Sequence, residues 1–443
     1  MSTTTRRLPT SEHLVAPPSL LRFATAGSVD DGKSTLVGRL LHDTKSVLAD
    51  QMEAIERASH SRGQRGPDLA LLTDGLRAER EQGITIDVAY RYFATPRRRF
   101  ILADTPGHVQ YTRNMVTGAS TAELAVVLVD ARNGVVEQTR RHAAVAALLR
   151  VPHLVLAVNK MDLVEWSEKA FAGITNEFTA YTAALGVPGV TAIPTSALAG
   201  DNVVEPSANM AWYEGRTLLE HLENVPVGAD PSNEPARFPV QYVIRPQTDE
   251  HSDYRGYAGQ VAAGVLRVGE PVSVQPSGQT STVKGIDLLG KPVDSAYAPQ
   301  SVTVHLADDL DVARGDLIAP TASAPAPTRD VEAMVCHLNE RTLRVGDQVL
   351  LKHSARTVRA IVKAIPHRLD IAGVDQRNGL VKDECAGDLG MNDIGRVVLR
   401  TTEPLALDDY ATSRRTGSFV LIDPADGATL TAGMIGGAFG HSR

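Results

Sequence analysis

A lysine and a serine close a glycine-containing stretch near the start of the chain. The segment GSVDDGKST, residues 27–35, matches the pattern G-x-x-x-x-G-K-[ST]. In such a loop, backbone N–H groups and the positive end of the following helix dipole hold a chain of phosphates. Lys33 would reach the β- and γ-phosphates, and the Ser34 hydroxyl would ligate Mg²⁺. The alternative is a turn that matches by chance, but the apolar run LLRFATA before the loop and the helical pattern KSTLVGRLLHD after it favour phosphate binding.

A second motif places a carboxylate at the end of an apolar run. ILADTPGH, residues 101–108, is an expected strand that ends in Asp104 and is followed by a small turn. Asp104 would hold the magnesium through water, and the Gly107 amide would contact a γ-phosphate. Both roles require this turn to lie beside the phosphate loop.

Two more motifs indicate the base. VLAVNKMD ends in Asp162, whose carboxylate can accept hydrogen bonds from N1 and N2 of guanine, donors that adenine does not offer. PTSAL, residues 194–198, ends the last expected strand, where the backbone of residues 196–198 would support the guanine carbonyl. These motifs, in this order at strand ends, predict a GTP site with Mg²⁺. The expected nucleotide-binding residues are Gly27, Ser28, Val29, Asp30, Asp31, Gly32, Lys33, Ser34, Thr35, Asp104, Thr105, Pro106, Gly107, His108, Asn159, Lys160, Met161, Asp162, Ser196, Ala197 and Leu198.

Composition excludes several classes of protein. A chain of 443 residues is too long for one ordinary core, so two or three domains are expected. The formal net charge of -7 disfavours a chain-wide electrostatic contact with nucleic acid. Cys336 and Cys385 lie far apart without metal-ligand spacing, which indicates neither a disulfide framework nor a zinc site and fits a reducing cytoplasm. Because no run of eighteen apolar residues occurs, we expect no membrane span, and the N-terminal stretch does not resemble a signal peptide.

The pattern of apolar and polar residues changes twice along the chain. Short apolar runs alternate with amphipathic stretches from residue 21 to about residue 222, which is typical of a parallel sheet covered by helices. A linker rich in Pro, Gly, Asp and Asn follows, and then two β-rich stretches separated by PTASAPAPTRD. The expected fold class is an α/β P-loop GTPase domain with a mostly parallel sheet, followed by two small β-barrels. The expected domain bounds are 20–225, 235–322 and 328–438.

The motifs also carry a family resemblance. GSVDDGKS, GITID, DTPGH, NKMD and TSAL together resemble the motifs of the translational GTPases, the EF-Tu-like proteins, and the expected three-domain organisation resembles theirs. The resemblance implies that Thr85, in GITID, ligates Mg²⁺ in the GTP state. The implied metal ligands are therefore Ser34, Thr85 and Asp104.

The same resemblance assigns catalytic roles. His108, in DTPGH, would position the attacking water, with Lys33 and Thr85 as the other catalytic residues. Val29 and Ile84 would form an apolar gate in front of the histidine. A lone histidine is more commonly a surface loop residue, but the position of His108 directly after the γ-phosphate-contacting glycine favours the catalytic interpretation.

Departures from the translation factors narrow the resemblance. Those factors usually read GHVDHGKT or GHVDSGKS in the first loop, where this chain has Ser28 and Asp31, and this chain has YTRNM where elongation factors commonly carry YVKNM or FIKNM. These variants, with STLVGRLLHDTK, LLKHSARTVRA and GSFVLIDPADGATLTAGMI, are similar to the large GTPase subunit of bacterial sulfate adenylyltransferase, the CysN family. The similarity runs from about residue 21 to residue 435.

This narrower resemblance implies a function. GTP hydrolysis would drive adenylyl transfer from ATP to sulfate, which gives adenosine 5'-phosphosulfate (APS) and pyrophosphate. A separate small adenylyltransferase subunit of the ATP-pyrophosphatase type would bind ATP and sulfate, so the chain would belong to a cytoplasmic hetero-oligomer with no nucleic-acid or membrane partner. Because the chain has no second P-loop, we expect adenylyl-sulfate kinase activity to reside on another protein.

Two other functions share part of the pattern. A translation elongation factor that delivers aminoacyl-tRNA has the same expected fold, but the acidic charge balance and the loop variants count against it. A scaffold that binds GTP without hydrolysing it is disfavoured by the presence of Lys33, Thr85 and His108 together. The charge run PRRR, residues 96–99, is interpreted as a solvated turn between two strands rather than a contact for RNA or an acidic partner.

Overall fold

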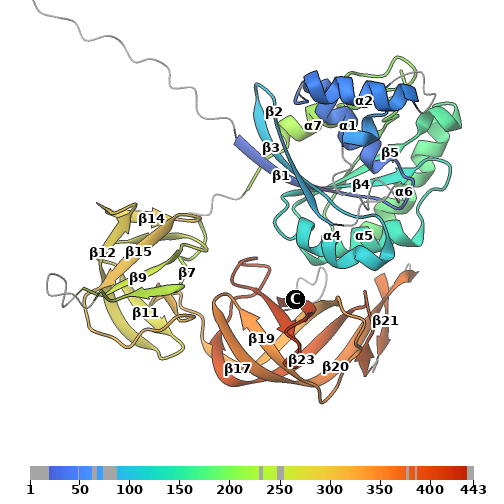
Figure 1. The fold of residues 1–443 in the computed structure, drawn as a ribbon. Helices are drawn as coiled ribbons and strands as arrows, with labels where there is room; N and C mark the ends of the chain where they lie inside the picture. Colours follow the sequence, from blue (N-terminus) through green and yellow to red (C-terminus); the bar gives the residue numbers. More distant parts are fainter. Residues whose placement is uncertain are drawn as a thin grey trace, which may run out of the picture.

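Three groups of elements follow one another along the chain (Figure 1). The structure, a computed structural model, describes residues 19–47, 49–61, 67–72, 87–228, 233–246, 254–375, 379–384 and 387–436. We refer to residues 19–228 as the α/β domain, to residues 233–320 as the middle β domain and to residues 327–436 as the C-terminal β domain. This order of one α/β unit and two β units confirms the predicted fold class.

The sheet of the α/β domain has the strand order β2-β3-β1-β4-β5-β6. All neighbouring pairs are parallel except β2 with β3, so the sheet is mostly parallel, as predicted. β4 reads LAVVLVD and is buried along its whole length, as is typical of a central parallel strand covered on both faces. The strands are β1 (Ser19–Ala26), β2 (Ala89–Ala94), β3 (Arg98–Asp104), β4 (Leu124–Asp130), β5 (His153–Asn159) and β6 (Val190–Pro194).

Helices cover both faces of this sheet. Apolar residues of α1 and α7 pack with one face into a single buried cluster, and residues of α4, α5 and α6 pack with the other face into a second cluster. Figure 1 shows α4 and α5 on the side of the sheet that faces the C-terminal β domain. The helices are α1 (Lys33–Asp43), α2 (Ala49–Ser61), α4 (Thr112–Ala119), α5 (Glu137–Leu148), α6 (Glu168–Ala184) and α7 (Leu218–Asn224), with short 3-10 helices η1 (Leu69–Leu72), η2 (Val109–Tyr111) and η3 (Met161–Val164).

The middle β domain has a main curved antiparallel sheet and a separate pair of strands around its own apolar core. Its main path runs β7-β16-β11-β12-β15-β9-β8, with β13 paired to β12 and a separate pair of β10 with β14. The strands are β7 (Phe238–Pro239), β8 (Tyr242–Ile244), β9 (Gly256–Gln260), β10 (Val265–Arg267), β11 (Pro271–Gln275), β12 (Gln279–Leu288), β13 (Lys291–Val293), β14 (Ser295–Tyr297), β15 (Ser301–Leu306) and β16 (Leu317–Pro320).

The C-terminal β domain closes into a barrel. Its path β19-β24-β25-β17-β23-β20 returns to its start because β19 also pairs with β20, and β21 extends from β20. The strands are β17 (Pro327–His337), β18 (Leu343–Arg344), β19 (Gln348–His353), β20 (Arg356–Asp375), β21 (Gly379–Glu384), β22 (Asp388–Leu389), β23 (Ile394–Ala406), β24 (Ser418–Ile422) and β25 (Thr429–Ile435).

Side chains of the C-terminal β domain contact the other two domains. Arg414 donates hydrogen bonds to the carbonyl oxygens of Ala122 (3.0 Å) and Ser120 (2.7 Å), just beyond the end of α4. The hydroxyl of Tyr410 donates to the carbonyl oxygen of Leu149 at 3.1 Å, next to the end of α5. Asp408 forms a buried ion pair with Arg237 of the middle β domain, and Asp408 Oδ2 lies 2.9 Å from Arg237 Nε. All three domains are thereby joined through residues 408–414.

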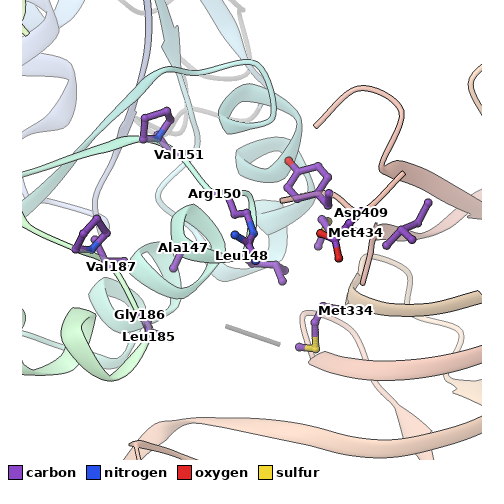
Figure 2. A pocket seen from close by; sticks show the side chains of 14 residues that line it. Ala147, Leu148, Arg150, Val151, Leu185, Gly186, Val187, Met334, Asp409 and Met434 are labelled. Carbon is purple, nitrogen blue, oxygen red and sulfur yellow. The ribbon is translucent and has the colours of Figure 1, made fainter. Parts of the chain in front are cut away.

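A cavity of about 220 Å³ lies between the α/β domain and the C-terminal β domain (Figure 2). Leu148 and Arg150 line it from the α/β domain, and Met334, Asp409 and Met434 line it from the C-terminal β domain. None of its lining residues belongs to a predicted nucleotide-binding motif, so the cavity is separate from the site described below.

The charge run PRRR forms an exposed turn between β2 and β3 at residues 96 and 97, as expected, but the expectation was wrong for one of its arginines. Arg98 of PRRR is buried in β3 rather than solvated, and its Nη1 donates to the carbonyl oxygens of Leu222 (2.9 Å) and Val225 (2.7 Å) at the end of α7. Carbonyl groups at a helix C-terminus lack partners within the helix, so the buried guanidinium group provides their hydrogen bonds and the carbonyl oxygens provide acceptors for its N–H groups.

Among the residues that the structure describes, no helix is long and apolar enough to cross a membrane.

Candidate functional site

The predicted phosphate loop connects β1 to α1 at the carboxyl edge of the parallel sheet. Asp30 and Gly32 have positive φ angles of 69° and 87°, so the backbone turns tightly and can direct successive N–H groups to one side. A Cβ at Gly32 would lie 2.5 Å from Nδ2 of Asn159, so only glycine fits there. Ser34 and Thr35 follow in the first turn of α1, as predicted.

The DTPGH turn lies directly against this loop. β1 and β3 are parallel neighbours in which Thr25 pairs with Asp104, so both strands end at the same edge. The Thr105 hydroxyl donates to the carbonyl oxygen of Thr25 at 2.6 Å, which ties the turn to the end of β1. A Cβ at Gly107 would lie 2.3 Å from the carbonyl oxygen of Gly27, so the two backbones approach as closely as glycine allows. The predicted proximity of the two motifs is therefore present.

Lys33 and Asp104 meet beneath the loop. Lys33 Nζ lies 3.4 Å from Asp104 Oδ1, and both side chains are buried. Thr25 Oγ1 also donates to Asp104 Oδ1 at 3.1 Å, whereas Asp104 Oδ2 is buried without a hydrogen-bond partner among the described residues. A buried carboxylate oxygen without a hydrogen-bond partner, at the sheet edge where α1 begins with Lys33 and Ser34, suits a hard cation such as Mg²⁺, which prefers oxygen ligands. The residues present therefore fit the predicted metal.

The base-recognition motifs converge on the same loop. Asn159 Nδ2 donates to the carbonyl oxygen of Asp31 at 2.7 Å, and its Oδ1 accepts from the Ala197 N–H at 2.9 Å. Lys160 Nζ donates to the carbonyl oxygen of Asp30. Asp162 lies in η3 and is half-buried, two positions after Lys160. The NKMD segment therefore contacts both the phosphate loop and the SAL segment.

Sequence reasoning missed Asp130, which the structure places at the centre of this network. Asp130 ends β4 and is buried, with Lys160 Nζ 3.0 Å and Arg132 Nη2 2.6 Å from its Oδ2. Burial alone raises the pKa of Asp130, but the hydrogen bonds from Arg132 and Lys160 outweigh it and hold the pKa at about 2. The available signal was an aspartate at the end of a fully apolar run, VLVD.

Arg39 was missed as well. From the middle of α1, its Nε and Nη2 donate to the carbonyl oxygens of Ala197 (3.2 Å) and Leu198 (2.6 Å). The carbonyl groups of this segment are therefore held toward α1, which leaves the opposite side of the segment to face a base. A single arginine on a helix gave no signal in the sequence, because its partners lie about 160 residues later.

His108 lies in the segment between β3 and α4, directly before η2. It is half-buried, its Nδ1 accepts a long hydrogen bond of 3.5 Å from the Gln110 N–H, and its ring centroid lies 6.0 Å from that of Tyr111. Val29, the member of the predicted gate that lies within the described residues, is 45% exposed. Thr85 and Ile84 lie outside the described residues, so their roles stay predictions.

Comparison with known proteins identifies the family. Residues 18–226 match the elongation factor Tu GTP binding domain, and residues 330–436 match the GTP-eEF1A C-terminal domain-like family. Sulfate adenylyltransferase subunit 1 of Aeromonas hydrophila is 49% identical over 425 residues, which cover 96% of this chain and 87% of that protein. The chain belongs to the sulfate adenylyltransferase subunit 1 family. A member from Bacteroides thetaiotaomicron is likewise 49% identical, over 94% of this chain and 86% of that protein.

A longer curated protein and a solved structure are also similar to this chain. The bifunctional enzyme CysN/CysC of Mycobacterium tuberculosis strain H37Rv is 56% identical over 418 residues, which cover 94% of this chain and 67% of that protein. Among solved structures, sup35 complexed with GDP is 23% identical, with a TM-score of 0.41 and coverage of 97% of both chains. The match of residues 18–226 to the family model, and not the sup35 structure, shows that the α/β domain is a GTP-binding domain of the elongation factor Tu type.

Proposed function

We propose that this chain is the GTP-hydrolysing subunit of sulfate adenylyltransferase (ATP sulfurylase), in which GTP hydrolysis drives adenylyl transfer from ATP to sulfate. The observation that carries the proposal is 49% identity to sulfate adenylyltransferase subunit 1 over 96% of the chain, together with a guanine-nucleotide site whose motifs converge at one sheet edge. The alternative of a translation factor has no comparable support, because relatives at 47–56% identity over most of the chain carry sulfate adenylyltransferase or CysN names.

The chemistry explains why such an enzyme would consume GTP. Adenylyl transfer breaks a phosphoanhydride of ATP, releases pyrophosphate and forms the phosphosulfate anhydride of APS. The new anhydride is less stable than the one broken, so the transfer lies far toward ATP and sulfate. Coupling each transfer to cleavage of GTP adds a favourable reaction to the cycle and displaces it toward APS.

The residues of the site divide the work of GTP hydrolysis. Lys33 would contact the β- and γ-phosphates, and Asp162 would accept from guanine. His108, next to the glycine that touches the phosphate loop, would hold the attacking water in line with the γ-phosphate. Ser34, Asp104 and Thr85 would hold Mg²⁺, which when bound would neutralise charge that develops on the phosphate oxygens.

The partner is a separate small subunit of the ATP-pyrophosphatase type that binds ATP and sulfate. Relatives named subunit 1 support a hetero-oligomer, and the chemistry of adenylyl transfer requires an ATP site in addition to the GTP site. The low cysteine content without disulfide spacing supports assembly in a reducing cytoplasm.

A capture experiment tests the proposal. The purified chain, loaded with a non-hydrolysable GTP analogue, is used to capture partners from its native lysate, and proteins and RNA in the eluate are identified. We expect an ATP-pyrophosphatase-like subunit, and a complex that makes APS faster with GTP than with GDP or the analogue. Recovery of aminoacyl-tRNA or ribosomes, or APS formation indifferent to GTP, contradicts the proposal.

A further inference from the structure

Asp31 places a carboxylate underneath the phosphate loop. Its side chain is 4% exposed, and its Oδ2 accepts a hydrogen bond of 2.6 Å from the N–H of Ser28. The backbone N–H of Asp130, at the end of β4, also donates to this carboxylate. A Cβ at Gly27 would lie 3.5 Å from Oδ2, so the carboxylate packs against the first glycine of the loop. Asp31 therefore joins the loop to the neighbouring strand from the protein side.

The electrostatic surroundings of Asp31 are unfavourable to a negative charge. Of the charged groups that face it, Asp130 on β4 repels it and Lys160 after β5 attracts it. Lys160 lies 3.0 Å from Asp130, and Lys33 on α1 lies 3.4 Å from Asp104, so both lysines face other carboxylates. Among the described residues, none forms an ion pair with Asp31 itself.

Burial dominates the protonation of Asp31. Loss of water around the side chain raises the pKa of Asp31 to about 6, although the hydrogen bonds from Ser28 and Asp130 and the charge of Lys160 act in the other direction. A nucleoside diphosphate or triphosphate adds several negative charges on the other side of the same loop. Like charges in one site disfavour the ionised carboxylate, so a bound nucleotide raises this pKa further.

We propose that Asp31 is a positioning residue for the nucleotide, whose carboxyl group supports the phosphate loop through Ser28 and takes up one proton from solvent when the nucleotide binds. A protonated carboxyl group still offers its carbonyl oxygen to the Ser28 N–H, so the support survives protonation. The proton removes a like charge beneath the phosphates. Nucleotide binding therefore weakens as pH rises above the pKa of Asp31 in the free protein, because the proton that is taken up on binding is then at a lower concentration in solution.

The inference rests on guanine-nucleotide binding in the proposed function, and proton counting tests it directly. GDP with Mg²⁺ is titrated into the full chain by calorimetry at pH 7.5 in two buffers that differ in ionisation enthalpy. We expect the wild-type protein to take up between about one third and one proton per GDP. Asp31→Asn should abolish this uptake and flatten the rise of Kd between pH 6.5 and 8.0. Asp50→Asn, an exposed aspartate of α2, is the matched control and should behave as wild type.

The outcomes separate three cases. Proton uptake that is absent in the wild-type protein, or equal in wild type and Asp31→Asn, overturns the role of Asp31. If Asp31→Asn does not unfold cooperatively, Asp31→Ser replaces it, since a hydroxyl accepts the same N–H without titrating near neutral pH. Absence of any GDP or GTP binding in the wild-type protein counts against the proposed function instead.

Discussion

Arg39 Nη2, in the helix that follows the phosphate loop, donates a hydrogen bond of 2.6 Å to the carbonyl oxygen of Leu198, in the loop predicted to face the guanine carbonyl. The helix that begins the phosphate site therefore also holds the backbone of the base site. Both ends of a nucleotide are thus presented by elements that cannot move independently without breaking this contact.

Arg39→Ala should weaken guanine recognition. Loss of the hydrogen bonds to the carbonyl groups of Ala197 and Leu198 frees that backbone, at a cost of about 1–2 kcal/mol, or roughly 5- to 30-fold in the Kd for GDP. Inosine diphosphate keeps the 6-carbonyl but lacks the 2-amino group from which Asp162 would accept a hydrogen bond. Because Arg39 acts on the backbone that faces the 6-carbonyl, Arg39→Ala should raise the Kd for inosine diphosphate by the same factor as the Kd for GDP. Asp43→Ala removes the ion-pair partner of Arg39, which also contacts the His42 ring, without removing the Arg39 side chain, and is the control. Unchanged GDP affinity in Arg39→Ala contradicts the prediction.

The parts of the site that could be predicted are those encoded locally. Asp104 ends an apolar run, and such runs become parallel strands whose carboxyl ends share one edge. The motif of Asp162 follows another such run. Each motif is contiguous in sequence, and the alternating pattern predicts a parallel sheet whose strands end at one edge, so the gathering of the motifs at that edge follows from local patterns. The strand order itself was not predicted.

The parts that could not be predicted depend on contacts between distant segments. Arg98 belongs to a run of arginines that favours a solvated turn, yet carbonyl groups at the end of α7, more than 120 residues later, make its burial favourable. Arg39 looks like any charged residue on a helix. Asp130 is recognised as central only when Lys160, which directly follows the next strand, is placed beside it. Apolar residues recur with the period of a helix or a strand, but single polar residues such as these do not. Their partners can therefore be identified only from the tertiary structure.

His108→Ala should slow GTP hydrolysis without weakening nucleotide binding. A side chain that orients the attacking water and assists its deprotonation contributes about 10²- to 10⁴-fold to a rate. Single-turnover hydrolysis of GTP by the purified chain, or by the complex with its small subunit, measures this step separately from product release. His60→Ala, an exposed histidine of α2, should leave the rate unchanged. An unaltered rate in His108→Ala would remove the histidine from the mechanism.

Arg414→Ala should loosen α4 from the C-terminal β domain. Arg414 satisfies carbonyl oxygens at the end of α4, including that of Ser120 at 2.7 Å, and a cation near a helix C-terminus is also favourable for the helix dipole. We expect the free energy of opening of α4 to fall by about 1–3 kcal/mol. Hydrogen exchange of the α4 amides measures it.

Two comparisons make the Arg414 result specific. Arg344→Ala, an exposed arginine of the same domain, should leave exchange in α4 unchanged. Arg414→Lys keeps the positive charge but loses the geometry for several carbonyl oxygens, so its effect should lie between wild type and Arg414→Ala. Equal protection of α4 in all variants would show that the interface does not depend on this side chain.

The free energy of unfolding of the α/β domain should fall in mild acid because of His142, in α5. His142 is 1% exposed, its Nε2 is hydrogen-bonded to the Gln138 amide at 2.9 Å, and burial, with the charges of Lys33 and Arg141, lowers its pKa to about 3. The folded state thus keeps His142 neutral while the unfolded state binds a proton below pH 6.5, so stability is complete above that pH and is lost as pH falls toward 3. From pH 7.5 to 5.0 the loss from this residue is about 2 kcal/mol.

The test compares His142→Asn with the wild-type protein at those two pH values. The free energy of opening of α5, measured by hydrogen exchange, should fall by about 2 kcal/mol more in wild type than in His142→Asn, because asparagine does not titrate. His42→Asn, a more exposed histidine on α1, should retain the wild-type pH dependence. If wild type and His142→Asn lose the same free energy between pH 7.5 and 5.0, His142 must be able to ionise within the folded domain.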